Sequence, residues 1–170
     1  MRIFLIYCLL IVKALSLNSR KDLNELENVG GKWYHFESNI PYTGIGYKIS
    51  DNTGNIIIEK KFINGIYSGK YLEWWDDGKS KAKGTFRNGL MHGRWKFYYE
   101  NGDLFCSGSY DNANNGFLMN GINGIPKKGK SGLWTYWNEG GKKIEEGYFR
   151  KGEQYGRWAF WDNKGKRYSG

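Results

Sequence analysis

Aromatic residues and glycines recur along the chain at an interval of 24 residues. Two consecutive copies of the pattern begin at Gly69 and Gly93, a later copy begins at Gly132, and a truncated last copy begins at Gly156. Counting back 24 residues from Gly69 reaches a weaker first copy at Ile45. Five blocks that share one set of offsets predict a repeat array, in which each block buries its apolar face against its neighbours.

Each copy places aromatic residues at constant distances from its first residue, which is counted as offset zero. Those at offset two are Tyr47, Tyr71, Trp95, Trp134 and Trp158, and those at offset five are Trp74, Tyr98, Trp137 and Trp161. Glycine occupies offset nine in all five copies and offset fifteen in three of them, and offset seventeen is aromatic in four. No helical period runs through this pattern, so it predicts strands.

Two turn signals divide each copy into a pair of strands. The first is a dipeptide that ends in glycine at offset nine, such as Asp77-Gly78. The second lies at offsets nineteen and twenty, as in Asn64-Gly65, Asn88-Gly89 and Lys151-Gly152. Such dipeptides favour two-residue hairpin turns, because glycine adopts the positive φ that a type I′ turn requires. Each copy therefore predicts a strand, a tight turn, a second strand and a tight turn into the next copy.

Two-residue turns determine which residues pair across the first hairpin. The offsets of opposed residues then sum to seventeen, so the aromatic at offset two faces the glycine at offset fifteen, and the aromatic at offset seventeen faces the first glycine. A ring can then lie over bare backbone, which stabilises glycine in a strand. On the other face the same rule pairs Tyr98 with Phe105 and Trp137 with Ile144. A bulge near offset three would instead bring offsets two and five to one face.

The predicted fold is all-β: an elongated, single-layer, twisted antiparallel meander of 24-residue hairpins over residues 45–170, with aromatic ladders on both faces. The third copy carries 15 extra residues before Gly132, and the Gly- and Asn-rich insertion at about 114–131 predicts a long loop. Residues 17–44 are expected to form an N-terminal cap and lead-in. The spacing of Leu23, Leu26 and Val29 permits a brief helix in this cap.

Residues 1–16 have the layout of a secretory signal peptide. Arg2 precedes an apolar stretch at 3–12, and Ala14-Leu15-Ser16 places small residues at the −3 and −1 positions of a cleavage site after Ser16. The apolar run ends at Lys13, well short of the ~20 residues that span a bilayer. The alternative interpretation is a buried N-terminal strand. The sequence therefore predicts a secreted, periplasmic or cell-envelope protein.

Charge and cysteine content refine this picture only moderately. The net charge is +9, and loss of Arg2 and Lys13 would leave 24 basic and 17 acidic residues, or +7. Such a balance favours an acidic partner such as anionic lipid, acidic protein or nucleic acid, although a soluble protein can also simply be basic. Cys106 is the one cysteine beyond the predicted cleavage site, so we expect no internal disulfide.

The residues that could support catalysis are few. His92 lies beside a glycine where other copies carry Ser68 and Tyr155, which indicates a turn residue. His35 has no counterpart in the repeat and remains a candidate acid or base. Cys106, at offset thirteen, is interpreted as a small core residue. The sequence shows no Ser-His-Asp signature, no metal-ligand spacing and no cofactor motif, so it favours a non-enzymatic protein.

A binding surface is the function that the sequence favours. The candidate residues combine aromatic and basic side chains, namely Trp74, Tyr98, Trp137, Trp161, Arg94, Lys96, Lys127, Lys128 and Lys130. The expected partner is another protein, and the alternative is an anionic lipid surface or acidic polymer that contacts the basic stretch at 126–130. Nucleic acid is less favoured, because the aromatic rings occupy offsets that every copy uses for its fold.

The blocks resemble the bacterial variant of MORN repeats, the type found in the YwqK-type antitoxin family. The matching residues are the PYTG lead-in at 41–44, the frame of G-x-W-x-x-Y/W followed by N-G, G-x-Y/F and H-G, and above all FRNGLMHGRWKFYYENG at 86–102. The resemblance covers about residues 41–170. It implies an array of β-hairpins that serves as a protein-binding, scaffolding or membrane-associated surface, with an antitoxin-like or immunity-like role. The insertion and the predicted signal peptide depart from the family pattern.

Overall fold

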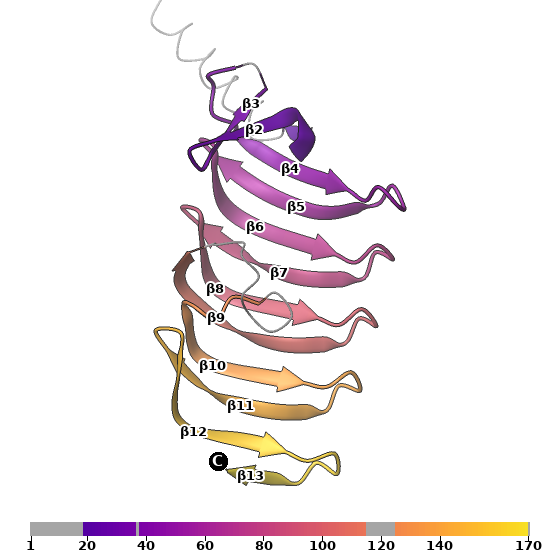
Figure 1. Ribbon diagram of the computed structural model, residues 1–170, viewed down its shortest axis with the longest axis vertical. Coiled ribbons are helices and arrows are strands. Elements are labelled where there is room, and N and C mark those ends of the chain that lie inside the picture. The colour runs from indigo at the N-terminus through magenta and orange to yellow at the C-terminus, as the bar shows by residue number, and fades with distance from the viewer. Residues whose placement is uncertain (1–18, 37, 115–124, 170) are drawn as a thin grey trace, which may run out of the picture.

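The computed structural model describes residues 19–36, 38–114 and 125–169, so the predicted signal peptide and the middle of the insertion lie outside the described residues. These residues form an open sheet of eleven strands and a separate sheet of two strands, which confirms the predicted all-β meander. Figure 1 shows the hairpins stacked one above another in chain order. Within the described ranges there is no α-helix, and hence no helix of the length and apolarity that a membrane crossing requires.

Five hairpins make up most of the large sheet. They are β4 (Gly44–Ile49) with β5 (Ile56–Ile63), β6 (Ile66–Trp74) with β7 (Ser80–Arg87), β8 (Leu90–Tyr98) with β9 (Leu104–Asn114), β10 (Lys130–Trp137) with β11 (Lys143–Arg150), and β12 (Glu153–Trp161) with β13 (Arg167–Ser169). Each of these strands is antiparallel to the next. The first strand, β1 (Arg20–Asp22), pairs in parallel with β4 at the edge of the sheet.

The N-terminal cap consists mainly of strands. The brief helix that the spacing permits is reduced to one 3-10 turn, η1 (Leu23–Glu25), and the next residues form β2 (Leu26–Val29) and β3 (Lys32–His35). The reason is the pair Gly30-Gly31, whose positive φ angles turn the chain back so that β2 pairs with β3. The cap joins the first hairpin through a buried cluster that contains Leu26, Tyr42 and Phe62.

The second turn of the repeat is the predicted type I′ turn. The first turn residue has a φ of 51° at Asn64, 50° at Asn88 and 55° at Lys151, and the glycine that follows also has a positive φ. The flanking residues pair directly in each case, as Arg87 does with Leu90. Two residues at positive φ match the right-handed twist of the strands, which is why these dipeptides predicted the turn correctly.

The first turn of the repeat is one residue longer than predicted. In the β6–β7 hairpin the backbone N–H of Trp75 donates to the carbonyl oxygen of Lys79 at 2.8 Å, which leaves a three-residue loop that ends in Gly78 at a φ of 84°. The longer loop shifts the register, so Trp74 opposes Ser80, and a bulge then restores the predicted register further along the strands.

This loop also corrects the pairs expected at offset five. Tyr98 opposes Leu104 rather than Phe105, and Trp137 opposes Lys143 rather than Ile144. The extra residue of the bulge is at offset twelve of the second strand, as Phe105 is, so alternation along the first strand is unbroken and offsets two and five still lie on opposite faces. The turn sequence alone did not distinguish a two-residue loop from a three-residue loop that ends in glycine at the same offset.

The first hairpin begins one residue earlier than the 24-residue interval predicted. Gly44, not Ile45, opposes Phe62 in the position that Gly69 takes against Phe86. The first turn of this hairpin has four residues, because the N–H of Ser50 donates to the carbonyl oxygen of Asn55. Tyr47 is therefore not equivalent to the core aromatic residues at offset two.

Each glycine at offset fifteen lies beneath a tryptophan of the next hairpin. The predicted pairing is confirmed, since Trp95 opposes Gly108 and Trp134 opposes Gly147. The ring over the glycine is, however, that of the following copy: a Cβ on Gly108 would overlap the Trp134 ring. The glycines at offset zero are not covered by a ring; Gly132 adopts a φ of 66° with nothing within 4 Å of its Cβ position.

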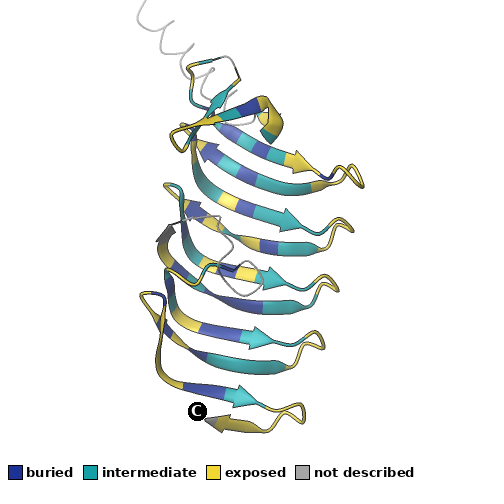
Figure 2. Cartoon of the chain, in the orientation of Figure 1, coloured by how far each residue is buried: buried dark blue, intermediate teal, exposed yellow. Residues whose placement is uncertain are grey.

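The aromatic core lies on one face of the sheet, which is called the inner face. It contains the rings at offsets two and seventeen, namely Tyr71, Phe86, Trp95, Tyr110, Trp134, Phe149 and Trp158, all 7% exposed or less. Figure 1 shows that the strands bend sharply near the second turn, and Figure 2 shows buried positions recurring from hairpin to hairpin. Because the bend makes the inner face concave, a single sheet can bury these rings.

The contact between Gly108 and Trp134 yields the first prediction. Replacing Gly108 by alanine places a methyl group inside the ring, so we expect Gly108→Ala to lower the free energy of unfolding by about 3 kcal/mol. Urea denaturation followed by tryptophan fluorescence measures this loss. Gly140→Ala is the matched control, because its Cβ would meet only a side-chain oxygen at 3.5 Å, and equal stability of the two variants would contradict the packing argument.

Candidate functional site

The outer face is the face of the sheet opposite the aromatic core. Residues on it alternate with core residues along each strand, as Lys96 does with Trp95. One cross-strand row of the outer face contains Leu72, Lys83, Lys96, Ser107, Thr135, Glu146 and Ala159, each directly opposite the next. This register places the outer-face residues of successive hairpins side by side, so they can form one surface.

The four candidate aromatic residues all lie on this face near the first turns. Trp74, Tyr98, Trp137 and Trp161 come from alternate strands, about 10 Å apart, and each is partly buried. Basic side chains already lie over two of the rings. The Lys83 amine is 5.6 Å from the centre of the Tyr98 ring, and Lys143 lies 5.0 Å from that of Trp161. The rings are therefore only partly available to a ligand.

Arg94 and Lys96 share the outer face with Tyr98, as the sequence predicted, and both are exposed. Lys83 on β7 lies directly opposite Lys96 on β8. Strands β6, β7 and β8 contain a single acidic residue, Glu73, and it is on the inner-face side, where it forms an ion pair with Lys81 at 2.9 Å. Within the described residues, none of the three outer-face cations takes part in an ion pair. The three form an uncompensated basic cluster.

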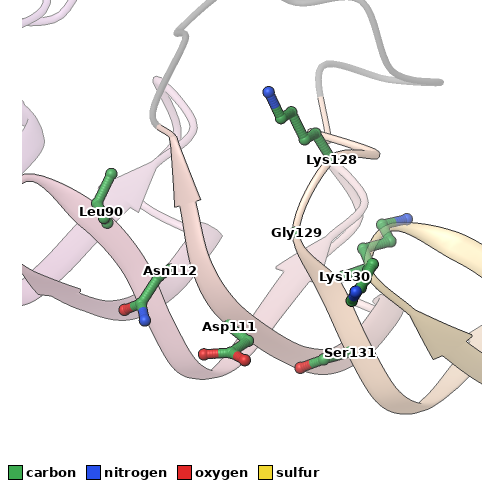
Figure 3. Close-up of a pocket in the computed structure, with 8 residues that line it drawn as sticks. Leu90, Asp111, Asn112, Lys128, Gly129, Lys130 and Ser131 are labelled. Carbon is green, nitrogen blue, oxygen red and sulfur yellow. The ribbon is translucent and has the colours of Figure 1, made fainter.

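Lys127 and Lys128 do not belong to this cluster. They precede β10 near the second turns, and Lys127 lies 3.5 Å from the carboxylate of Glu153. A hollow of about 320 Å³ lies beside them, and Figure 3 shows Lys128 on one side of it, with Leu90 and Asn112 on the other. The hollow combines acidic and basic side chains without convergence on one point, so we assign it no chemistry.

Lys130 is a buried residue, which corrects its assignment to the candidate surface. It is 7% exposed and lies on the inner face opposite Tyr110, in the position that Met91 takes opposite Phe86. Its amine is 4.3 Å from the centre of the Trp134 ring and 3.0 Å from the Tyr136 hydroxyl. Burial lowers the pKa of this amine to about 8. Lys130 therefore cannot contribute to an anionic-surface site at 126–130.

The sequence interpretation missed an apolar triplet on the outer face. Leu133, Tyr148 and Tyr155 lie directly opposite one another on β10, β11 and β12, and they are 44%, 55% and 57% exposed. A comparison of outer-face offsets between copies would have pointed to them, because the two preceding copies of the repeat carry polar residues at these offsets. The preceding triplets are Lys70, Thr85 and His92, and then Arg94, Ser109 and Ser131.

The two histidines do not assemble a catalytic group. His92 is a strand residue of β8 opposite Thr85, rather than the turn residue that the sequence suggested, because the turn is completed at Gly89. His35 lies on β3, edge-on to the Tyr42 ring at 5.1 Å. In the part of the chain that the structure describes, no three His, Cys, Asp or Glu side chains are placed to hold a metal ion.

Cys106 is a core residue, as its offset predicted. It is fully buried, and burial raises the pKa of its thiol to about 12. A thiol with such a pKa is almost entirely protonated at neutral pH, and the thiolate is the nucleophilic form. Cys106 is thus suited to packing rather than to covalent chemistry.

Comparison with known proteins adds little to this geometry. No family model matches the sequence, and no curated protein matches it. Among solved structures, the chain is similar to a Glycosylation Associate Protein (Gap123) complex from Streptococcus agalactiae, with 17% identity and a TM-score of 0.36. The similarity covers 84% of this chain but 23% of that one, so this chain spans about a quarter of its length. A likeness this distant says nothing about what this chain does.

The environment of Lys130 yields a prediction about pH. The pKa of its amine is about 8 in the folded protein against 10.5 for a free lysine, so between these values the unfolded state binds more protons and stability rises with pH. Lys130→Met, which copies Met91, removes this contribution. We expect the stability of the native protein relative to the variant to rise by about 1–3 kcal/mol between pH 7 and pH 10.

Urea denaturation of both proteins at the two pH values measures this difference. All other ionisable side chains are the same in the two proteins, so the difference between them reports on Lys130 and its contacts. Parallel pH dependence of the two unfolding free energies would show that the Lys130 amine is not desolvated in the folded state.

Proposed function

We propose that the protein is a non-enzymatic binding scaffold whose outer face takes up a protein partner. The observation that supports this most directly is the exposed triplet Leu133, Tyr148 and Tyr155. Its three side chains are adjacent on neighbouring strands and each leaves about half of its surface exposed. Contiguous exposed apolar and aromatic side chains are typical of protein interfaces, where tyrosine is enriched.

The repeat itself provides an internal control for this argument. Strands β8, β9 and β10 place Arg94, Ser109 and Ser131 at the equivalent positions and build the same sheet. The fold therefore does not require apolar side chains in the triplet. Residues that a scaffold does not need for its own packing are the ones that a binding function can select.

The cellular setting of this proposal comes from the sequence. Residues 1–16 have the layout of a signal peptide, so we place the partner in the cell envelope or outside the cell. The resemblance to MORN-type repeats of the YwqK antitoxin type supports a scaffold, and within that class an immunity-like role would make the partner a toxic protein. Binding of anionic lipid or of an acidic polymer is the second candidate function, and the cluster of Lys83, Arg94 and Lys96 is its specific support.

Site-specific photocrosslinking tests the proposed face. A benzoyl-phenylalanine introduced in place of Tyr148, in the full chain and in the native cells, is expected to give a discrete protein adduct. The matched control carries the same group in place of Val29, an exposed apolar residue of β2 in the separate N-terminal sheet. Adducts of equal yield at both positions, or none at position 148, would refute binding through the triplet.

A further inference from the structure

The outer face is divided into a basic half and an apolar half. Its basic half lies on β6, β7 and β8 and carries five exposed cations, namely Lys70, Lys83, Arg87, Arg94 and Lys96. Its apolar half lies on β10, β11 and β12 and carries Leu133, Tyr148 and Tyr155, with the exposed Arg150 and Arg157 beside them. Both halves belong to the same face, since Leu133 and Thr135 are two residues apart and Thr135 belongs to the row that contains Lys96.

The centre of the basic half is a pair of like charges. Lys83 and Lys96 are directly opposite across β7 and β8, an arrangement that destabilises a sheet. The fold does not require two lysines at these positions, because Ser107 and Thr135 form the equivalent cross-strand pair one repeat later. Within the described residues no carboxylate compensates this pair. A bound anionic group would relieve the repulsion, so the pair indicates a negatively charged ligand.

The neighbouring aromatic rings indicate which anionic ligand this is. A chain of sugars or nucleobases would stack on successive free rings, but cations lie over three rings of this face: Lys83 lies over that of Tyr98, and Arg150 lies over that of Tyr155. Lys143 and Arg167 lie over that of Trp161. What the face offers instead is charge beside exposed apolar side chains. This combination matches a polypeptide that carries carboxylates next to apolar residues.

The dimensions of the face suit one protein partner. From β7, which carries Lys83, to β11, which carries Tyr148, there are four strand spacings, or about 19 Å. A standard protein interface covers about 800 Å² on each partner, which spans this distance in one contact. The basic and apolar halves can therefore be contacted together.

We propose that the outer face binds an acidic protein surface in one orientation, with its carboxylates over Lys83, Arg94 and Lys96 and its apolar side chains over Leu133, Tyr148 and Tyr155. This inference rests on the proposed function and adds the chemistry and the orientation of the partner. The charged half increases the rate of association and selects the partner, and the apolar half slows its release.

Synthetic peptides labelled with fluorescein test the proposal by fluorescence anisotropy with the full chain. One peptide joins a glutamate block to a leucine–phenylalanine block, and two others contain a single block. We expect the joined peptide to bind about tenfold more tightly than either block alone, and its affinity to fall about tenfold between 50 and 300 mM NaCl.

Swaps between hairpins provide matched variants that the fold already accepts. The double variant Lys83→Ser, Lys96→Thr introduces the residues found at these positions one repeat later. It is expected to lower the affinity for the joined peptide about tenfold. Tyr148→Ser with Tyr155→Ser copies the preceding hairpin and is expected to reduce its affinity to that of the glutamate block. The control variant Lys127→Ser, Lys128→Thr removes two positive charges that lie outside the outer face. It is expected to leave the affinity for the joined peptide unchanged.

The outcomes separate this inference from the function on which it rests. If the lysine swap on the face acts no more strongly than the control swap, the orientation is wrong. If heparin or phosphatidylglycerol vesicles bind through the lysines and the tyrosine swap changes nothing, the ligand is an acidic polymer or a membrane and the inference is overturned. A Tyr148 crosslink that persists undiminished in the lysine swap upholds the proposed function alone, whereas no crosslink removes that function as well.

Discussion

The contact between a tryptophan and a glycine of the preceding hairpin is the interaction on which the rest of the sheet depends. Trp95, Trp134 and Trp158 each occupy the space that a side chain on Gly84, Gly108 or Gly147 would need. The ring and the glycine belong to different copies, so a hairpin cannot make this contact alone and is stabilised by the next one. The same rings then meet those at offset seventeen edge-to-face, as Phe149 meets Trp158 at 5.2 Å. A continuous core thus forms in a single bent sheet.

This arrangement leaves the outer face free to vary. Equivalent outer-face triplets contain Lys, Thr and His on β6, β7 and β8, then Arg, Ser and Ser on β8, β9 and β10, and then Leu, Tyr and Tyr on β10, β11 and β12, while the register that carries them is the same. The first turns are held by separate contacts: the Trp75 indole donates to the carbonyl oxygen of Tyr99 at 3.0 Å, and the Tyr99 hydroxyl donates to that of Trp137 at 2.9 Å. Neither contact uses the outer-face triplets, so a binding surface can change without loss of the fold.

Two lysines show how the core accepts charge when aromatic rings surround it. Lys130 takes the place of Met91, and Lys60 lies opposite Gly46 where other hairpins place a glycine at offset fifteen. The Lys60 amine is 4.8 Å from the centre of the Tyr67 ring, and burial lowers its pKa to about 8. Cation–π contacts offset part of the desolvation of both amines. The net charge of the chain therefore overstates the charge available to a partner, and the basic stretch at 126–130 is less basic at the surface than its sequence indicates.

The sequence by itself determined the repeat, the hairpins, the type I′ second turns and the pairing of offset two with offset fifteen. These features are local, because glycine and asparagine set the turn dihedrals, and alternation along a strand follows from backbone geometry. The tertiary structure decided the length of the three-residue first turn, the start of the first hairpin at Gly44 and the burial of Lys130. It also decided that the ring covering each glycine at offset fifteen comes from the following copy. It also brought Leu133, Tyr148 and Tyr155 together. These properties depend on side chains from different strands and hairpins, whose packing against one another decides which side chains water can reach.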